Sequence, residues 1–357
     1  MILLNPGPVT LSARVRAALS AMDMCHREAD FAEMMLRIKG SLSAVYGEAT
    51  KNYDAIVLTG SGTGAVEAMI ASLVPAKAKL LIVENGVYGA RMSEMARRHG
   101  KAHQSLAHEW QDGLDLARIE TALKDPAITH VGVIHHETTT GRLNDLDGLG
   151  AICTRLNKPM LLDAVSSFGA EEIKWDAWNV WAAAATANKC LHGAPGLSFV
   201  MAPERALKEG NKQVASLYLD LHAYHAAQRD GFSPFTQATN VALALEAALA
   251  EFDEAGGQAA RLALYNKRSE AVRACLKDLG IAMFIPALES ASMLSSFKLP
   301  KNMSYDALHD AMRARNFVIY AGQGGLARDI FRIAVMGDIG ESDMMQLLRA
   351  FREILKA

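Results

Sequence analysis

A lysine and an aspartate each stand where an apolar run of the sequence ends. Asp163 follows the apolar residues 160–162, and Lys189 comes shortly after the apolar run 180–187. A lysine shielded in this way loses its proton readily and can form a Schiff base with an aldehyde. An aspartate at the carboxyl end of a buried strand is costly unless it has a positive partner, such as a protonated pyridine nitrogen. The two side chains could therefore hold opposite ends of one cofactor.

Each of these residues also has an ordinary structural interpretation. Asp163 could cap a helix, because serines follow it at positions 166 and 167. Lys189 could be a structural lysine. Neither residue alone decides between its structural and its cofactor-binding interpretation.

A glycine loop follows the first predicted strand of this region. Residues 60–65, with the sequence GSGTGA, match the pattern G-x-G-x-x-G/A, and Glu84 closes the next predicted strand. This arrangement is typical of nicotinamide-binding proteins. The same loop also presents backbone N–H groups at a helix N-terminus, which suits the phosphate of pyridoxal phosphate. The nicotinamide interpretation leaves Lys189 and Asp163 unexplained, and all three features together favour pyridoxal phosphate.

The elements that must position these residues alternate along the chain. Continuous apolar runs bounded by turn residues predict buried strands, at residues 54–60, 79–84, 129–136, 158–165, 180–187 and 197–202. Apolar residues at three- and four-residue spacing predict helices between them, at residues 64–74, 88–100 and 146–157. The pattern predicts an α/β fold with a mostly parallel central sheet, in which Asp163 and Lys189 lie at neighbouring strand ends.

The pattern changes near residue 240. Two long helices are predicted, followed by short strands and a closing helix, at residues 241–256, 260–280, 292–299, 317–321, 330–335 and 341–357. We expect a large cofactor-binding α/β domain over residues 16–249 and a smaller α+β domain over residues 250–357. Residues 1–15 should form an N-terminal arm that packs on the small domain.

Composition excludes several classes of function. The chain has 357 residues, half of them apolar, with 37 basic against 39 acidic residues and no basic block. We therefore expect small-molecule partners and no nucleic-acid or membrane surface. Four scattered cysteines without CxxC spacing and the absence of a signal-like amino terminus favour a cytoplasmic protein. No metal site is expected, because the paired histidines at 135, 136, 222 and 225 lack a companion carboxylate arrangement.

Several longer motifs carry a resemblance to a known family. They are LLNPGPV, GSGTGAVEA, NGVYGARM, HHETTTG, DAVSSFG and TANKCLHGAPG. From about residue 4 to residue 339, the chain resembles the class V aminotransferases. The resemblance implies a fold-type I transferase that depends on pyridoxal phosphate and forms a homodimer with shared active sites.

The resemblance also implies roles for individual residues. Lys189 would bind the cofactor covalently, and Asp163 would hold the pyridine nitrogen. The remaining cofactor-binding residues would contact the phosphate, the ring faces or the ring hydroxyl. Those at the phosphate are Ser61, Gly62, Thr63 and Asn188, with Thr236 and, as a weaker candidate, Thr239 reaching across the dimer interface. Those at the ring are Tyr88 on one face, Val165 on the other and Thr139 near the hydroxyl.

The substrate pocket is expected around Arg332, Gly7 and Arg27. Arg332 matches the arginine that binds the substrate anion, since a planar guanidinium meets a carboxylate or phosphonate with paired charge-assisted bonds. The resemblance implies transfer of an amino group from 2-aminoethylphosphonate to pyruvate, giving phosphonoacetaldehyde and L-alanine. An alanine:glyoxylate or related small amino-acid aminotransferase is the alternative. Arg27 could contact substrate or be a surface residue.

Two segments depart from the pattern expected for phosphonate enzymes. Where we expect Tyr-Pro-Gly-Lys before the arginine strand, residues 320–323 read Tyr-Ala-Gly-Gln. A positive charge near the pocket is therefore missing. Residues 235–240 also lack an expected proline and histidine.

Overall fold

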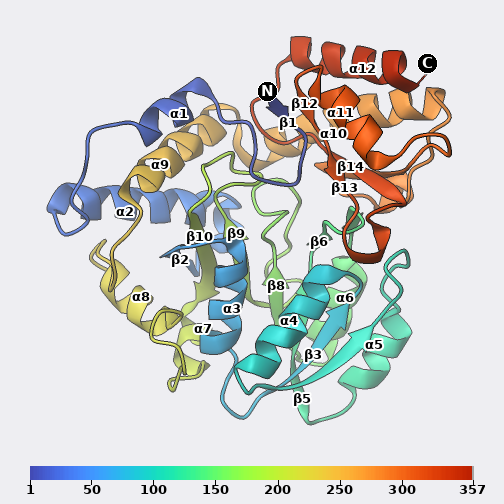
Figure 1. The fold of residues 1–357 in the computed structure, drawn as a ribbon. Helices are drawn as coiled ribbons and strands as arrows, with labels where there is room; N and C mark the ends of the chain where they lie inside the picture. The colour runs from blue at the N-terminus through green and yellow to red at the C-terminus, as the bar shows by residue number, and fades with distance from the viewer. Residues whose placement is uncertain (356–357) are drawn as a thin grey trace.

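A seven-stranded sheet forms the centre of the larger part of the molecule (Figure 1). The computed structural model describes residues 1–355. In spatial order the strands are β2 (Tyr53–Thr59), β10 (Leu197–Pro203), β9 (Val180–Thr186), β8 (Met160–Asp163), β5 (Ile128–Ile134), β3 (Lys79–Glu84) and β4 (Ala102–Ala107). Only β10 runs antiparallel to its neighbours in this sheet. The predicted α/β fold with a mostly parallel sheet is confirmed.

Helices cover both faces of this sheet, which explains why its strands are continuously apolar. Along β2, Ile56 and Leu58 join a core with α3 (Gly62–Leu73) and α4 (Val87–Arg98). Ala55 and Val57 join the opposite core. That second core is covered by α2 (Ala29–Ala44), α5 (Leu116–Leu123), α6 (Leu146–Arg155) and α9 (Thr239–Glu254). Because successive side chains of a strand point to opposite faces, a strand buried on both faces needs an apolar residue at every position.

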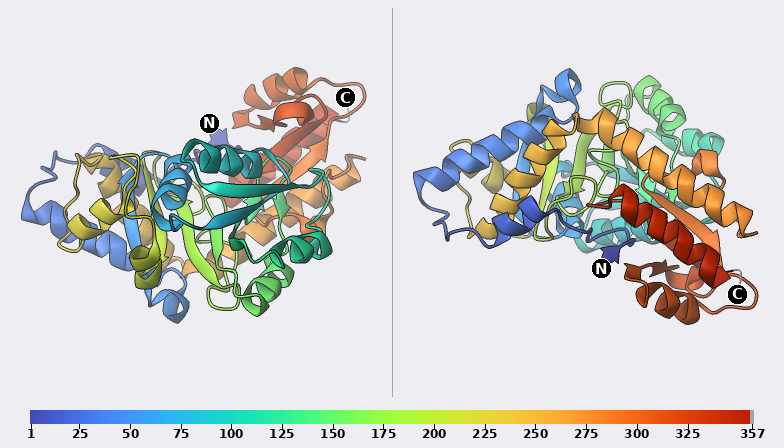
Figure 2. Two further views of the ribbon diagram at one scale, coloured as in Figure 1. Left: turned by 90° about the horizontal axis from the view of Figure 1, so that it is seen from below. Right: turned by 90° about the horizontal axis from the view of Figure 1, so that it is seen from above.

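The C-terminal part has a separate core around a three-stranded antiparallel sheet. Its strands are β11 (Leu294–Lys298), β14 (Ile330–Ala334) and β13 (Tyr320–Ala321), and its helices are α10 (Gly257–Asp278), α11 (Tyr305–Arg313) and α12 (Glu341–Leu355). The amino terminus joins this part, because β1 (Ile2–Leu3) pairs with β12 (Phe317–Val318). Figure 2 shows these elements at one end of the molecule, away from α2 and α8 (Leu221–Gln228). The domain boundaries proposed above stay a prediction.

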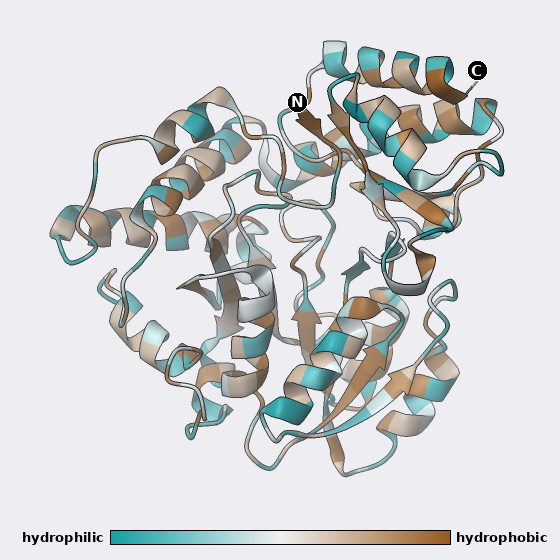
Figure 3. Cartoon of the chain, viewed as in Figure 1, coloured by the Kyte–Doolittle hydropathy of each residue, from teal (hydrophilic) through white to brown (hydrophobic). Residues whose placement is uncertain are grey.

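The remaining elements are short. They are α1 (Ala13–Leu19), α7 (Glu204–Glu209), the hairpin strands β6 (His136–Glu137) and β7 (Arg142–Leu143), and the 3-10 helices η1 (Gly47–Thr50), η2 (Ala287–Glu289) and η3 (Gly324–Leu326). In Figure 3 the central strands are brown, whereas α4 and α12 alternate brown and teal residues. Among the helices within residues 1–355, none is long and apolar enough to cross a membrane.

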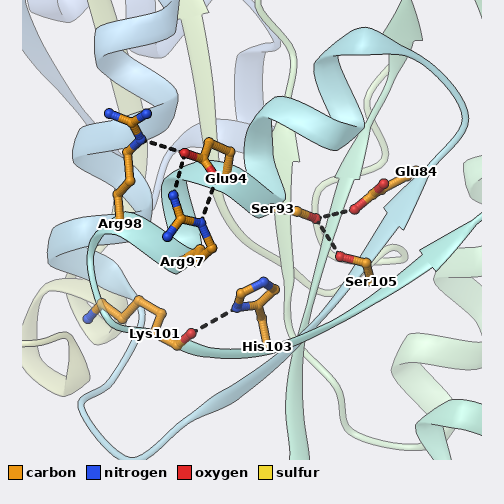
Figure 4. A network of polar contacts seen from close by, with 8 residues as sticks. All are labelled: Glu84, Ser93, Glu94, Arg97, Arg98, Lys101, His103 and Ser105. Carbon is orange, nitrogen blue, oxygen red and sulfur yellow. Dashed lines mark hydrogen bonds and ion pairs between the residues drawn. The ribbon is translucent and has the colours of Figure 1, made fainter.

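The edge strand β4 has no counterpart among the predicted strands. Among the described strands it pairs only with β3 and it is largely exposed, so it mixes polar residues with alanines and one leucine and lacks a continuous apolar run. Figure 4 shows what fastens it: Ser93 of α4 contacts both Glu84 of β3 and Ser105 of β4, the latter at 2.8 Å. Side-chain hydrogen bonds therefore help to attach β4 to the sheet, and the hydrophobic periodicity of the sequence does not predict such bonds.

Candidate active site

Asp163 is the last residue of β8 and lies buried at the carboxyl edge of the sheet. Its Oδ1 accepts a hydrogen bond from the backbone N–H of Val165 at 3.0 Å. Burial raises the pKa of Asp163 to about 6, the hydrogen bond from Val165 opposes this change, and the negative charge of Glu137 adds to it. A cation beside Asp163 would favour its ionised form. The carboxylate is therefore suited to hold a protonated ring nitrogen.

Lys189 follows the neighbouring strand, β9, by three residues. Desolvation lowers the pKa of its ammonium to about 8, and the nearby charge of Asp163 acts in the opposite direction. The amine is thus closer to its neutral, nucleophilic form than an exposed lysine is. The sheet register, in which Asp163 lies opposite Ala184 of β9, brings the two functional groups to one edge.

Gly7 of the N-terminal arm lies directly against the Lys189 side chain. A Cβ atom at position 7 would stand 2.8 Å from Cδ and 2.9 Å from Cε of Lys189. The backbone of Gly7 also has a φ of +119°, which side-chain-bearing residues rarely adopt. Glycine at this position allows the arm to pass along the lysine.

The glycine loop forms the N-terminus of α3, close to Val165. Ser61 is the N-cap residue of α3 but makes no side-chain cap hydrogen bond. The first N–H groups of a helix have no intrahelical partner, and they attract an anion. A Cβ at Gly62 would meet Cγ1 of Val165 at 2.7 Å and Cβ of Thr186 at 3.3 Å. The helix terminus therefore lies beside the ends of the strands that carry Asp163 and Lys189.

Tyr88 and Thr139 are joined through a residue that sequence reasoning missed, Glu137. The buried carboxylate of Glu137 accepts from the N–H of Tyr88 at 3.2 Å, from the N–H of Thr139 at 3.0 Å and from the Thr139 hydroxyl at 2.6 Å. Thr139 Oγ1 in turn accepts from the N–H of Val87 at 3.2 Å. Burial raises the pKa of Glu137. Glu137 thus positions the start of α4, and the signal for it was an acid inside the motif HHETTTG.

The aromatic ring of Tyr88 is covered by a cation. The guanidinium of Arg91 lies 4.9 Å from the ring centroid and also contacts Thr63 Oγ1 at 3.4 Å. Asn188 Oδ1 accepts from the hydroxyl of Thr186 at 2.8 Å, and Thr186 lies beside Gly62 of the glycine loop. Contacts therefore link the predicted stacking residue to the predicted phosphate loop.

Arg332 lies in the middle of β14 and is 1% exposed. Its Nε donates to the carbonyl of Ala321 at 2.7 Å, and its Nη1 donates to the carbonyl of Thr138 at 2.6 Å and to Gln323 Oε1 at 3.3 Å. Nη2 is buried and has no partner among residues 1–355. The Tyr320 ring lies 5.2 Å from the guanidinium. A buried donor without a partner is costly, so Nη2 is suited to bind an anion.

Arg332 belongs to the same electrostatic neighbourhood as the lysine. Its positive charge helps to lower the pKa of both Lys189 and His136. Burial lowers the pKa of Arg332 itself, and the negative charge of Glu137 raises it. The small sheet therefore contributes the anion-binding candidate to a site built mainly on the large sheet.

Three predicted residues make no hydrogen bond to this group within the described chain. Arg27 is exposed and donates to the carbonyl of Ser233 at 2.9 Å. Thr236 is exposed, and Thr239 donates to Asn240 Oδ1 at 3.2 Å. Thr236 and Thr239 flank Gln237, whose side chain contacts the Thr59 hydroxyl at 3.0 Å, just before the glycine loop. Their roles stay predictions.

The residues present fit pyridoxal phosphate better than a nicotinamide cofactor. The fit rests on a buried carboxylate with a raised pKa, a lysine with a lowered pKa and a helix terminus without a side-chain cap, which lies beside Val165 and Thr186. Glu84, the acid that a nicotinamide ribose would need, is bonded to Ser93 (Figure 4). No group of three or more metal-binding side chains occurs within residues 1–355.

Comparisons with known proteins agree with this geometry. The family model described as aminotransferase class-V matches residues 15–326. The chain is 36% identical to a 2-aminoethylphosphonate–pyruvate transaminase of Burkholderia thailandensis, with 100% of this chain and 97% of that protein covered. It is 34% identical to a protein of the same name from Pseudomonas putida, with 99% and 97% covered.

Solved structures show the same fold. An alanine–glyoxylate aminotransferase from Nostoc sp. has a TM-score of 0.91 and 28% identity, with 99% of this chain and 95% of that chain covered. An aspartate aminotransferase of subgroup IV from Thermus thermophilus has a TM-score of 0.90 and 28% identity, with 100% and 99% covered. Similarity therefore extends over both parts of the molecule, including the strand that carries Arg332.

Proposed function

The chain belongs to the class V aminotransferase family, and we propose that it transfers the amino group of 2-aminoethylphosphonate to pyruvate, giving phosphonoacetaldehyde and L-alanine. The enzyme depends on pyridoxal phosphate. The observation that carries the proposal is the placement of Lys189 and Asp163 on adjacent strand ends, with pKa values of about 8 and about 6. The alternative is an alanine:glyoxylate or related small amino-acid aminotransferase, and the neutral Gln323 beside Arg332 is the feature that favours it.

Bound pyridoxal phosphate supplies an aldehyde that reacts with amines and a pyridinium ring that accepts electrons from the donor carbon. Lys189 Nζ would hold the cofactor covalently until the amino donor replaces it. Lys189 Nζ, whose pKa burial lowers to about 8, would serve as the base that takes a proton from the donor carbon and as the acid that gives one back. Asp163 would keep the ring nitrogen protonated, since its carboxylate is stabilised by that positive charge.

The other residues bind and orient. The amides and hydroxyls of Ser61, Gly62 and Thr63 would hold the phosphate at the N-terminus of α3, together with Asn188. Tyr88 and Val165 would cover the two ring faces. Thr139, fixed by Glu137, would lie near the ring hydroxyl.

Arg332 would bind the anionic group of each substrate in turn. The donor carries a phosphonate and the acceptor a carboxylate, and a guanidinium can donate to both. Gly7 and Arg27 complete the proposed pocket, Gly7 by leaving room beside Lys189.

We also propose a cytoplasmic homodimer that acts on small molecules and binds neither nucleic acid nor membrane. Thr236 and Thr239 would reach the phosphate of the partner subunit. This assignment is supported by the exposure of Thr236 next to the segment that contacts Thr59.

The test is a visible absorption spectrum of the purified protein, titrated with 2-aminoethylphosphonate and, separately, with L-alanine. We expect the band of the lysine-bound cofactor to disappear with the phosphonate and to return when pyruvate is added. A response to L-alanine without one to the phosphonate would keep the aminotransferase and reject the proposed donor. Absence of the band after addition of pyridoxal phosphate would reject the role of Lys189.

A further inference from the structure

The loop that carries Lys189 ends in a strained residue, His192. The backbone of His192 has a φ of +62°, in the left-handed region that residues other than glycine rarely adopt. Its N–H donates to the carbonyl of Lys189 at 3.0 Å, and the N–H of Gly193 returns to the carbonyl of Ala187 at 2.9 Å. The loop is thus a tight turn, and such a conformation persists only where surrounding contacts fix it.

The side chain of His192 makes such a contact with the C-terminal part of the molecule. Nε2 accepts from the backbone N–H of Gly337 at 2.8 Å and contacts the hydroxyl of Tyr265 at 2.6 Å. Because a backbone N–H can only donate, Nε2 must carry the lone pair and the ring proton must be on Nδ1. Burial and the charges of Arg261 and Arg268 hold the pKa of His192 well below its ordinary value, so the ring is neutral.

Helix α10 holds the same two segments together. Arg261 donates to the carbonyl of Cys190, next to Lys189, at 2.8 Å. Arg268, two turns further along α10, donates to the carbonyl of Val335 at 2.9 Å and to that of Gly337 at 3.2 Å. One face of α10 therefore anchors both the lysine loop and the segment that follows β14.

We propose that His192 is a positioning residue that sets the distance between Lys189 and Arg332. Lys189 lies three residues before His192, and Arg332 lies in the strand that leads to Gly337. The His192 to Gly337 hydrogen bond thus joins the loop of the proton-transferring amine to the strand of the anion-binding guanidinium. This inference rests on the proposed function, because a substrate must reach both groups at once.

The consequence concerns substrate length. The amine has to act at the carbon that bears the amino group while the guanidinium holds the anion at the other end. Misplacement by about 1 Å can cost about 100-fold in rate, so a fixed span should discriminate between donors that carry the same anion at different chain lengths. Loosening the His192 contact should weaken that selection and leave the cofactor contacts of Asp163 and the α3 terminus in place.

The test compares His192→Asn with the matched control His192→Gln. Asparagine tolerates the left-handed backbone better than histidine, but its side chain is one bond too short to reach Gly337. Glutamine has the length and an acceptor oxygen. The measurement is the ratio of kcat/KM for 2-aminoethylphosphonate to that for the homologue one methylene longer, 3-aminopropylphosphonate. We expect His192→Asn to lower this ratio about tenfold and His192→Gln to change it less than about threefold.

A second readout separates positioning from folding. Borohydride reduction followed by mass spectrometry of the Lys189 peptide measures how much lysine is joined to the cofactor, without any substrate. We expect His192→Asn to retain this adduct within about twofold, and Tyr265→Phe to shift the length ratio in the same direction by a smaller factor. Equal losses with both substrate lengths, an unchanged ratio, or adduct loss in parallel with turnover would each overturn the proposal.

A wild-type enzyme that rejects phosphonates would contradict the proposed donor but would leave the spacing question open to test. In that case L-alanine and β-alanine, which also differ by one methylene between amine and anion, replace the phosphonate pair. If His192→Asn lowers the ratio of kcat/KM for L-alanine to that for β-alanine, the spacing role is supported. An unchanged ratio would contradict it.

Discussion

The two ends of the proposed site are built in different ways. The cofactor end is defined as Asp163, Lys189 and the glycine loop 60–65. Asp163 and Lys189 follow adjacent strands of the large sheet, and the loop forms the N-terminus of α3 beside them. The anion end is defined as Arg332 and Tyr320 of the small sheet with the nearby Gln323, and Arg332 also donates to the carbonyl of Thr138 in the turn between β6 and β7. The first is fixed by strand register, whereas the second depends on contacts between two parts of the chain.

This difference has a chemical meaning. At the cofactor end, burial lowers the pKa of Lys189, which favours its neutral amine, and raises the pKa of Asp163, whose ionised form then depends on a cation beside it. At the anion end, Arg332 Nη2 has no hydrogen-bond partner among residues 1–355, and the neutral side chain of Gln323 accepts a hydrogen bond from Nη1. Reaction type should therefore be insensitive to changes at the anion end, while substrate choice should respond to them.

The largest expected effect comes from Lys189→Ala, which would remove both the proposed covalent attachment and the proposed proton-transferring amine. We expect kcat to fall by at least about 1,000-fold, since general acid–base catalysis alone contributes about 100- to 10,000-fold. Single-turnover absorbance kinetics with the donor measure this. Lys189→Arg, which keeps a positive charge that cannot attack an aldehyde, should be equally inactive; recovery of activity in that variant would contradict a nucleophilic role.

Asp163→Asn tests the other member of the cofactor end. The amide cannot keep the ring nitrogen protonated, so we expect kcat to fall about 100-fold or more while substrate KM changes little. Steady-state kinetics in both substrates would show this split. A rise in KM with unchanged kcat would assign Asp163 to substrate binding instead.

The same variant has a predicted effect on stability without cofactor. Burial raises the folded-state pKa of Asp163 to about 6, so the folded protein binds a proton more tightly than the unfolded chain does. The stability contributed by this group is present below pH 4 and is lost as the pH rises to about 6. At pH 7 the cofactor-free Asp163→Asn protein should be more stable than the wild type by about 1 to 3 kcal/mol, with the difference vanishing near pH 4. Thermal unfolding across this range would detect it, and a gap independent of pH would refute the assignment.

Arg332→Lys addresses the anion end. Lysine keeps the charge but loses the planar fork and cannot satisfy the carbonyls of Ala321 and Thr138 together. We expect KM for donor and acceptor to rise about 10- to 100-fold, with the absorption band of the bound cofactor retained. Loss of the band would mean that Arg332 is also needed for cofactor binding, so that the anion end and the cofactor end are not independent.

The positions of Asp163 and Lys189 at strand ends were easier to predict from the sequence than the bonds of Glu137 and His192, for a physical reason. Strand ends and glycine loops leave a local pattern, so the positions of Asp163 and Lys189 followed from apolar runs and turn residues. Glu137 and His192 work through bonds to residues that are distant in the chain, such as Tyr88 and Gly337. The edge strand β4 was missed for a related reason. It is held by pairing with β3 and is largely exposed, so its residues show no regular apolar pattern from which a strand could be predicted.

The smallest expected effect, and the sharpest test of the comparison, is Gln323→Lys. A lysine there removes the neutral acceptor of Arg332 Nη1 and adds a positive charge beside the pocket. Since a phosphonate carries more negative charge than a carboxylate, the kcat/KM ratio of 2-aminoethylphosphonate to L-alanine should rise about 3- to 10-fold. Gln323→Met is the control, because it removes the acceptor without adding charge and should change the ratio less than about twofold. An equal rise in both variants would assign the effect to release of Arg332, and an unchanged ratio in both would show that substrate choice is set elsewhere in the site.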